Sequence, residues 1–283
     1  MHDAGVAFDV DSKYPADPAR RIRFIHSGQR GILRSVDTFF ANVARTPTAV
    51  GSASVELPIL YRDASQFGVF FTTDLAAARE LLKDAPVEPW PILGRAMAAI
   101  YVWEYRDTSV GPYHELGIGV QARRRGSRPS LVELGRNMEA QDDQGIWVVN
   151  LPVTTQAAYD AGVAIWGYPK YVTTITTRFE KDTASCRLGD ELTLAIGRPS
   201  GPRTRLPIVT YTRHPQGDLV RTVIATDHRV RWGSAAGARL ELRGDGPSAQ
   251  TVRRLGLHQR TPVLTFRTDS FRAKLPAGVT LPA

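Results

Sequence analysis

"AIYVWEYRDTSVGPYHELGIGV", residues 99–120, reads as a strand, a turn and a second strand. Aromatic and β-branched residues, which favour strands, lie on both sides of the turn-forming pair Gly111-Pro112. Glu104 ends the first strand and Glu115 begins the second, each among apolar and aromatic neighbours. A carboxylate that cannot reach water there must be paired, hydrogen-bonded or protonated, which suits proton transfer. Alternatively, either carboxylate reaches solvent from a strand end.

Outward from this hairpin, the chain is mostly β. Apolar or alternating segments separated by Gly, Pro or Asp predict strands at 97–105, 113–120, 146–151, 171–179, 184–196, 206–212, 219–225, 238–242 and 263–266. A further strand is predicted to end near Thr73, before a helix capped by Asp74 that runs to Leu82. Other predicted helices are 31–45, which is amphipathic, 131–138, 156–161 capped by Thr154 or Thr155, and 248–255.

This order of elements has many strands, scattered helices and no regular βαβ alternation. It favours an α+β fold built on a large antiparallel sheet or barrel. Residues 1–30 are polar and contain proline, so we expect an N-terminal arm there and a single domain over 31–283.

Composition excludes several classes of function. The chain has 283 residues and a formal charge of +8, much of it in short arginine runs such as Arg123–Arg125, which are typical of solvated loops. We therefore expect no nucleic-acid partner. With Cys186 as the single cysteine, and six histidines without ligand spacing, we expect no metal and no cofactor.

The N-terminus has acidic residues and no apolar signal segment, and no stretch approaches the roughly 18 apolar residues of a membrane span. We expect a cytoplasmic protein without a membrane partner.

"AIWGYPKYV", residues 164–172, places Lys170 in an apolar and aromatic run. Lysine is scarce here, 5 residues against 31 arginines, and unlike arginine it becomes a nucleophile when desolvation removes its proton. Pro169 fixes the backbone before Lys170, and Gly167 permits a close approach of the chain. We expect Lys170 at the start of the strand over 171–179, although a lysine after Tyr-Pro is also common on a surface.

At these residues the sequence resembles the acetoacetate decarboxylase superfamily. The resemblance covers about 57–180 and is carried by "WGYPKYV", "IWVVNLP", "YRDTSVGPYHELGI", "LPILYRDAS", "FFTTDLAAARELL" and "PVEPWP". It implies a cone-shaped antiparallel β-barrel with flanking helices, a homo-oligomer, and a lysine inside the barrel that forms a Schiff base with a keto acid.

By motif match the resemblance assigns the Schiff-base lysine to Lys170 and the pocket glutamate to Glu115, with Glu104 as a second one. It also places the apolar Leu151 beside the lysine. We further expect Tyr113, Trp166 and Tyr168 to contact the substrate.

The sequence also departs from the decarboxylases. Their second lysine, after the Schiff-base lysine, is Tyr171 here, and their Gly-Arg-Glu segment reads 162–164 as Gly-Val-Ala. Ala64 aligns with their strand arginine; Arg62, two residues earlier and therefore on the same face of a regular strand, is the expected anchor for a substrate carboxylate.

These losses favour a Schiff-base lyase that acts on a small keto acid by aldolase, dehydratase or cyclisation chemistry through Lys170. Two alternatives stay open: a 3-oxo acid decarboxylase such as acetoacetate decarboxylase, and a non-catalytic barrel that binds a small molecule.

Overall fold

The computed structural model describes residues 37–128, 139–141 and 143–281, and its contacts divide the chain into units 1–43 and 44–283. The helix expected over 31–45 is wrong where it is described: residues 37–45 form turns and irregular chain, and Asn42 has a left-handed φ of 56° that ends any helical run. A hairpin of β1 (Thr46–Val50) and β2 (Ala53–Leu57) follows. The helix expected over 131–138 lies outside the described residues.

The main sheet of the second unit closes on itself. Its ring of strands is β16 (Leu264–Leu275), β3 (Ile59–Thr73), β5 (Ala96–Thr108), β6 (Tyr113–Arg124), β7 (Gln144–Asn150), β12 (Ile208–Arg213) and β13 (Leu219–Thr226). The last strand of this series, β13, pairs with the first, β16, and this pairing closes the ring. All the pairings in the ring are antiparallel except that of β7 with β12. Shorter strands extend it: β4 (Val87–Pro89), β11 (Arg203–Thr204), β14 (Val230–Gly233) and β17 (Val279–Leu281).

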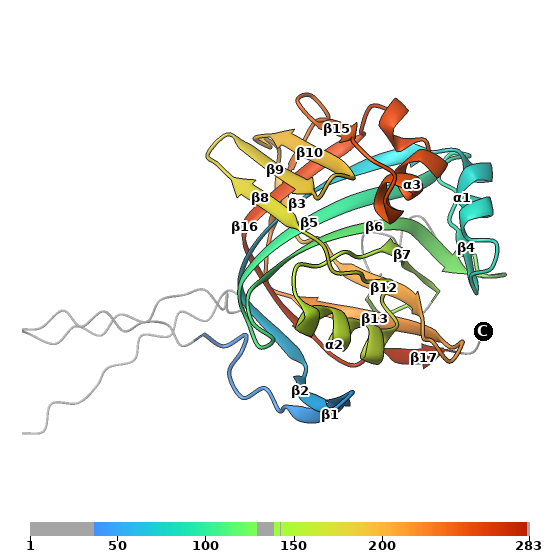
Figure 1. Cartoon of the computed structure of the whole chain (residues 1–283). Helices are drawn as coiled ribbons and strands as arrows, with labels where there is room; N and C mark the ends of the chain where they lie inside the picture. The colour runs from blue at the N-terminus through green and yellow to red at the C-terminus, as the bar shows by residue number, and fades with distance from the viewer. Residues whose placement is uncertain (1–36, 129–138, 142, 282–283) are drawn as a thin grey trace, which may run out of the picture. The chain divides into compact units, whose positions relative to one another are not determined.

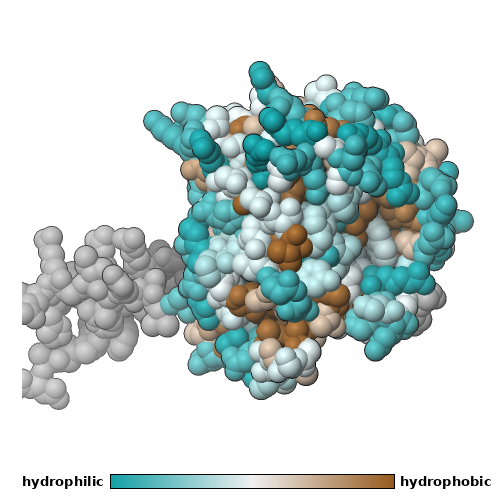
Figure 2. Space-filling model, viewed as in Figure 1, coloured by the Kyte–Doolittle hydropathy of each residue, from teal (hydrophilic) through white to brown (hydrophobic). Residues whose placement is uncertain are grey.

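A second sheet covers one side of this ring (Figure 1). It contains β8 (Ile175–Phe179), β9 (Thr183–Leu188), β10 (Leu192–Gly197) and β15 (Arg239–Leu242). The single strand expected over 184–196 is therefore two strands, joined by a turn that begins at Gly189 with φ 42°. The more exposed residues of β9 are polar, and so is Thr193 on β10; Figure 2 shows hydrophilic surface over this part of the molecule.

Strands β3, β5 and β6 are buried on both faces, which explains their nearly continuous apolar runs. Side chains of one parity, including Val102 and Ile100, pack with the covering sheet in one core. Side chains of the other parity, including Tyr101 and Trp103, point into the ring and form a second core. This second core holds the candidate site.

Helices flank the sheets. They are α1 (Leu75–Leu81), α2 (Gln156–Trp166), α3 (Pro247–Arg254) and the 3₁₀ turn η1 (Leu257–Gln259). Thr155 caps α2 by accepting the Ala158 amide at 3.4 Å, whereas Asp74 makes no side-chain cap bond to α1 and pairs with Arg95 and Arg260. Within the described chain, no helix is long and apolar enough to cross a membrane. The predicted α+β class with a large curved sheet and flanking helices is confirmed.

Candidate active site

The segment that carries Lys170 is held by the end of α2. Gly167 stops the helix in a left-handed conformation, φ 64°, and any Cβ there would lie 2.4 Å from the Arg213 carbonyl oxygen. The amide of Tyr168 then donates to the Gly162 carbonyl at 3.1 Å, which satisfies a carbonyl at the helix end. Strand β8 begins only at Ile175, so Lys170 lies in the connection before it and not at the start of a strand as expected.

Three chain segments bring Lys170 to Glu115. Val153, which follows β7, forms an antiparallel bridge with Glu115 on β6 and a parallel bridge with Val172. The amide of Leu151 also donates to the Pro169 carbonyl at 3.0 Å. Val153 therefore lies between the Glu115 strand and the Lys170 segment. In this way Glu115 and Lys170, 55 positions apart in the sequence, point into one pocket.

The two ionisable side chains are in direct contact. The Lys170 Nζ lies 2.6 Å from Glu115 Oε2, and the side chains are 5% and 9% exposed. The hydroxyl of Tyr105 approaches the other carboxylate oxygen at 3.4 Å, which is long for such a bond. Proximity between a buried amine and a carboxylate permits direct proton exchange between them.

Buried phenols surround this pair. The hydroxyls of Tyr61 and Tyr113 lie 3.1 Å apart, and that of Tyr168 lies 2.9 Å from Thr210 Oγ1. Burial, with the charge of Glu115 next, raises the pKa of Tyr105 and Tyr113 well above the usual value. These phenols therefore keep their protons and act as hydrogen-bond donors at neutral pH.

The rest of the pocket wall is apolar and aromatic. The sequence-predicted residues Tyr113, Leu151, Trp166 and Tyr168 all line the pocket with Lys170 and Glu115. Trp166 is anchored by a bond from its indole nitrogen to the Pro276 carbonyl at 2.9 Å. The lysine is thus placed in the apolar setting that its sequence context indicated.

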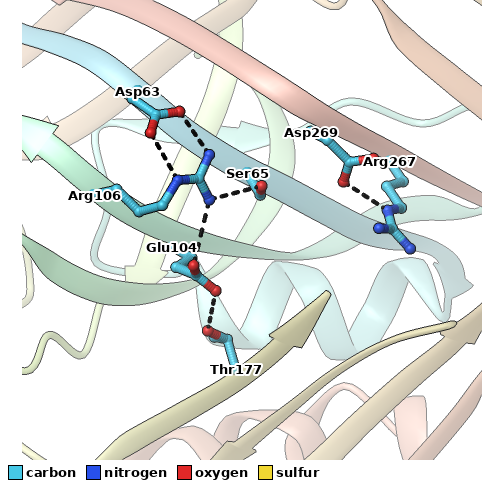
Figure 3. A network of polar contacts seen from close by, with 7 residues as sticks. All are labelled: Asp63, Ser65, Glu104, Arg106, Thr177, Arg267 and Asp269. Carbon is cyan, nitrogen blue, oxygen red and sulfur yellow. Dashed lines mark hydrogen bonds and ion pairs between the residues drawn. The ribbon is translucent and has the colours of Figure 1, made fainter. Parts of the chain in front are cut away.

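Glu104 lies elsewhere, which corrects the expectation that both glutamates share one pocket. In the hairpin Trp103 pairs with Glu115 and Glu104 pairs with His114, so Glu104 points to the other face of β5. There it accepts from Thr177 at 2.9 Å and pairs with Arg106 at 3.3 Å (Figure 3).

The same network includes Asp63, which Arg106 contacts through two nitrogens at 2.7 and 2.8 Å (Figure 3). Hydrogen bonding to Arg106 lowers the pKa of the Asp63 carboxyl below its usual value. The arrangement joins β3, β5 and β8 on the face away from Lys170.

Arg62 is also outside the pocket. Strand β3 has register irregularities between Tyr61 and Asp63 and between Asp63 and Ala64, so alternation does not hold there. Tyr61 and Ala64 both pack in the inner core, while the exposed Arg62 bonds to Asp107 at 3.2 Å. The expected carboxylate anchor therefore does not reach Lys170.

Sequence reasoning missed several residues of the site. Tyr61 and Tyr105 line the pocket, and the signal for Tyr105 was the alternation of aromatic residues along β5. Gly162 faces Lys170 so closely that a Cβ there would lie 2.3 Å from Lys170 Cε. The part of the chain that the structure describes contains no group of three or more His, Cys, Asp or Glu that could hold a metal ion.

Comparison with known proteins gives one family match. The model of the acetoacetate decarboxylase family matches residues 44–194, more than half of the chain, and includes Glu115 and Lys170. No curated protein matches in sequence.

Several solved structures are similar in fold. An acetoacetate decarboxylase from Legionella pneumophila subsp. pneumophila str. Philadelphia 1 is 16% identical, with a TM-score of 0.56 over 80% of this chain and 87% of that chain. The enduracididine biosynthesis enzyme MppR with pyruvate is 15% identical, with a TM-score of 0.56 over 82% and 93%. An acetoacetate decarboxylase-like enzyme from Sphingomonas wittichii RW1 is 14% identical, with a TM-score of 0.55 over 81% and 95%.

Proposed function

Because the chain belongs to the acetoacetate decarboxylase family, we propose that it is a lyase that forms a Schiff base between Lys170 and a small carbonyl substrate. The observation that carries this proposal is the buried contact of 2.6 Å between Lys170 and Glu115 inside an apolar pocket. Lys170 is the nucleophile and Glu115 moves the protons.

The contact with Glu115 prepares the nucleophile. Transfer of one proton from Lys170 Nζ to Glu115 Oε2 leaves a neutral amine and a carboxylic acid, and only the neutral amine can attack a carbonyl. The exchange also removes two opposite charges from a buried site, where each charge has lost its hydration. The Tyr105 hydroxyl lies 3.4 Å from the other carboxyl oxygen.

Imine formation follows from this proton transfer. The amine nitrogen bonds to the carbonyl carbon, Glu115 returns the proton to the carbonyl oxygen, and the resulting carbinolamine loses water to give a protonated imine. A bond then breaks at the carbon next to the imine carbon, either C–H, whose proton passes to the Glu115 carboxylate, or C–COO⁻, which leaves as CO₂. The electron pair of that bond moves to the imine nitrogen, which yields an enamine. The enamine carbon takes a proton, or it adds to an aldehyde whose oxygen takes the proton from Glu115. Water then adds to the imine carbon, and the carbon–nitrogen bond breaks to release the product and the free lysine.

Aldolase, dehydratase or cyclisation chemistry is the favoured type. Position 171, a second lysine in the decarboxylases that the sequence resembles, is Tyr171, whose hydroxyl bonds to Glu191 at 2.7 Å and Ser248 at 2.8 Å. Among the similar structures, MppR was solved with the condensation product of pyruvate and imidazole 4-carboxaldehyde. Both observations support condensation and dehydration chemistry over loss of CO₂.

Borohydride trapping tests the proposal. The protein is incubated with a panel of aldehydes, ketones and keto acids, reduced, digested and mapped by mass spectrometry. We expect the added mass on Lys170, its loss in Lys170→Arg, and its retention in Lys181→Arg, which changes an exposed lysine. If no carbonyl labels Lys170, the fold serves as a non-catalytic binding barrel and the proposal is wrong.

A CO₂-release assay with acetoacetate separates the two kinds of lyase. Turnover of roughly 1–1000 per second, the usual range for enzymes, would favour the decarboxylase alternative. We expect release well below this range, and products of condensation or dehydration when carbonyl donors, with pyruvate among them, are screened with an aldehyde.

A further inference from the structure

The wall of the Lys170 pocket contains an ordered group of aromatic rings. Tyr101, Trp103 and Tyr105 alternate along β5 and stack side by side, with ring centroids 5.6 and 6.2 Å apart and planes within 14°. Phe271 on β16 meets Trp103 at 69° and Tyr105 at 61°. Such stacked and edge-on arrangements are the ones that aromatic groups prefer, so the wall offers faces and edges to another ring or to alkyl groups.

The charges in this pocket already balance. Among the described lining residues, Lys170 is the one cationic side chain and Glu115 the one anionic side chain, and they contact each other. The nearby hydroxyls are also engaged, Tyr61 with Tyr113 and Tyr168 with Thr210.

A substrate carboxylate would therefore add an uncompensated charge. The imine formed with an uncharged carbonyl compound carries one positive charge, which the Glu115 carboxylate neutralises. The imine of a keto acid adds a carboxylate beside Glu115, and a buried carboxylate without a cation is costly. Arg62, the residue expected to supply that cation, bonds to Asp107 on the outer side of β3.

We propose that this site selects an uncharged aldehyde or ketone with an aromatic or branched alkyl group over a keto acid. The inference rests on the imine chemistry proposed above and replaces the keto-acid substrate expected from the sequence. The covalent step is the same: the carbonyl carbon bonds to Lys170 Nζ, and the carbonyl oxygen leaves as one molecule of water.

Two matched pairs of compounds test charge and ring separately. Phenylacetone and phenylpyruvate differ by a methyl group in place of a carboxylate, and so do acetone and pyruvate. The concentration that half-saturates borohydride labelling of Lys170 is measured for each compound. Each concentration is divided by the value for Nα-acetyllysine in solution, whose side-chain amine is free. This division corrects for the intrinsically greater electrophilicity of keto acids.

After this correction, we expect each ketone to label at a concentration at least about tenfold lower than its keto-acid partner, with phenylacetone the better ketone. Equal or better labelling by the keto acids would overturn the inference and leave the imine proposal standing. Failure of all compounds to label Lys170 would overturn the imine proposal itself.

The variant Phe271→Leu tests the aromatic wall, because it removes the ring and keeps an apolar side chain at that position. We expect its half-saturating phenylacetone concentration to rise about threefold to tenfold while that of acetone changes less than twofold, because only the aryl group contacts the ring edge. An equal change for both ketones would contradict the assignment of an aryl subsite. Near-unchanged melting temperature serves as the control for folding.

Discussion

The side chain of Lys170 runs directly across the backbone of Gly162 on α2. A Cβ built on Gly162 would lie 2.3 Å from Lys170 Cε and 2.5 Å from its Cδ. Since real Cβ atoms do not approach carbon so closely, the absence of a side chain at Gly162 fixes the path by which Lys170 reaches Glu115.

We expect Gly162→Ala to reduce the rate of borohydride labelling of Lys170 by at least tenfold, because the methyl group displaces the amine from Glu115. Helix propensity alone would make this change favourable by about 1 kcal/mol. Gly197→Ala is the matched control, since a Cβ there meets nothing nearer than 3.9 Å. Unchanged labelling in Gly162→Ala would show that the lysine takes another path.

The buried ion pair makes a second prediction, about stability. Lys170→Met leaves Glu115 buried beside no cation, and Glu115→Leu leaves Lys170 without an anion, so each single change should destabilise the fold by about 3 kcal/mol. The double variant removes both charges and should recover most of this loss. Denaturant midpoints of the three variants check it, and additive losses in the double variant would contradict it.

The two glutamates of the hairpin give a third prediction. Glu115→Gln should lower Lys170 labelling by at least tenfold, since an amide cannot exchange the proton. Glu104→Gln should change labelling less than twofold and stability by at most about 1 kcal/mol, because Glu104 pairs with a half-exposed Arg106 on the far face of β5. Comparable loss of labelling in both variants would mean that Glu104 does take part.

Much of the fold could be predicted from the sequence. The apolar runs and turn residues identify β5, β6, β7, β12 and β13 closely, and Asp74 and Thr155 mark the starts of α1 and α2. The prediction of a helix over 31–45 is wrong for residues 37–45, because the spacing of apolar residues shows only that one helix face could be buried. It does not show that another part of the chain packs on that face.

The site could be predicted in part. Lys170 and Glu115 stand out because a charge in an apolar run has to be paired, and the structure pairs them. The sequence does not tell on which face of β5 Glu104 lies. Both faces of this strand are buried, so hydrophobicity does not distinguish the face that lines the ring. The irregular register around Tyr61 likewise places Arg62 outside, and such an irregularity has no clear sequence signal.

His228 lies outside the proposed chemistry and makes the last prediction. Its ring packs 4.8 Å from that of Phe271, and neither ring nitrogen has a hydrogen-bond partner among the described residues. Burial, and then the charge of Arg205, lowers the pKa of His228 to about 4. Between pH ~6.5 and that value, the unfolded chain takes up a proton that the folded protein refuses.

Acidification should therefore destabilise the fold through His228, by about 2 kcal/mol between pH 7.5 and pH 5. His228→Phe removes the titrating group and keeps a ring against Phe271. From pH 7.5 to pH 5 its free energy of unfolding should therefore fall by about 2 kcal/mol less than that of the unchanged protein. His258→Phe, at an exposed histidine, is the control and should keep the pH dependence of the unchanged protein. Urea unfolding at both pH values measures all three proteins. If His228→Phe loses as much stability as the unchanged protein, His228 must be protonated in the folded state at pH 5, and its ring must find a partner or solvent there.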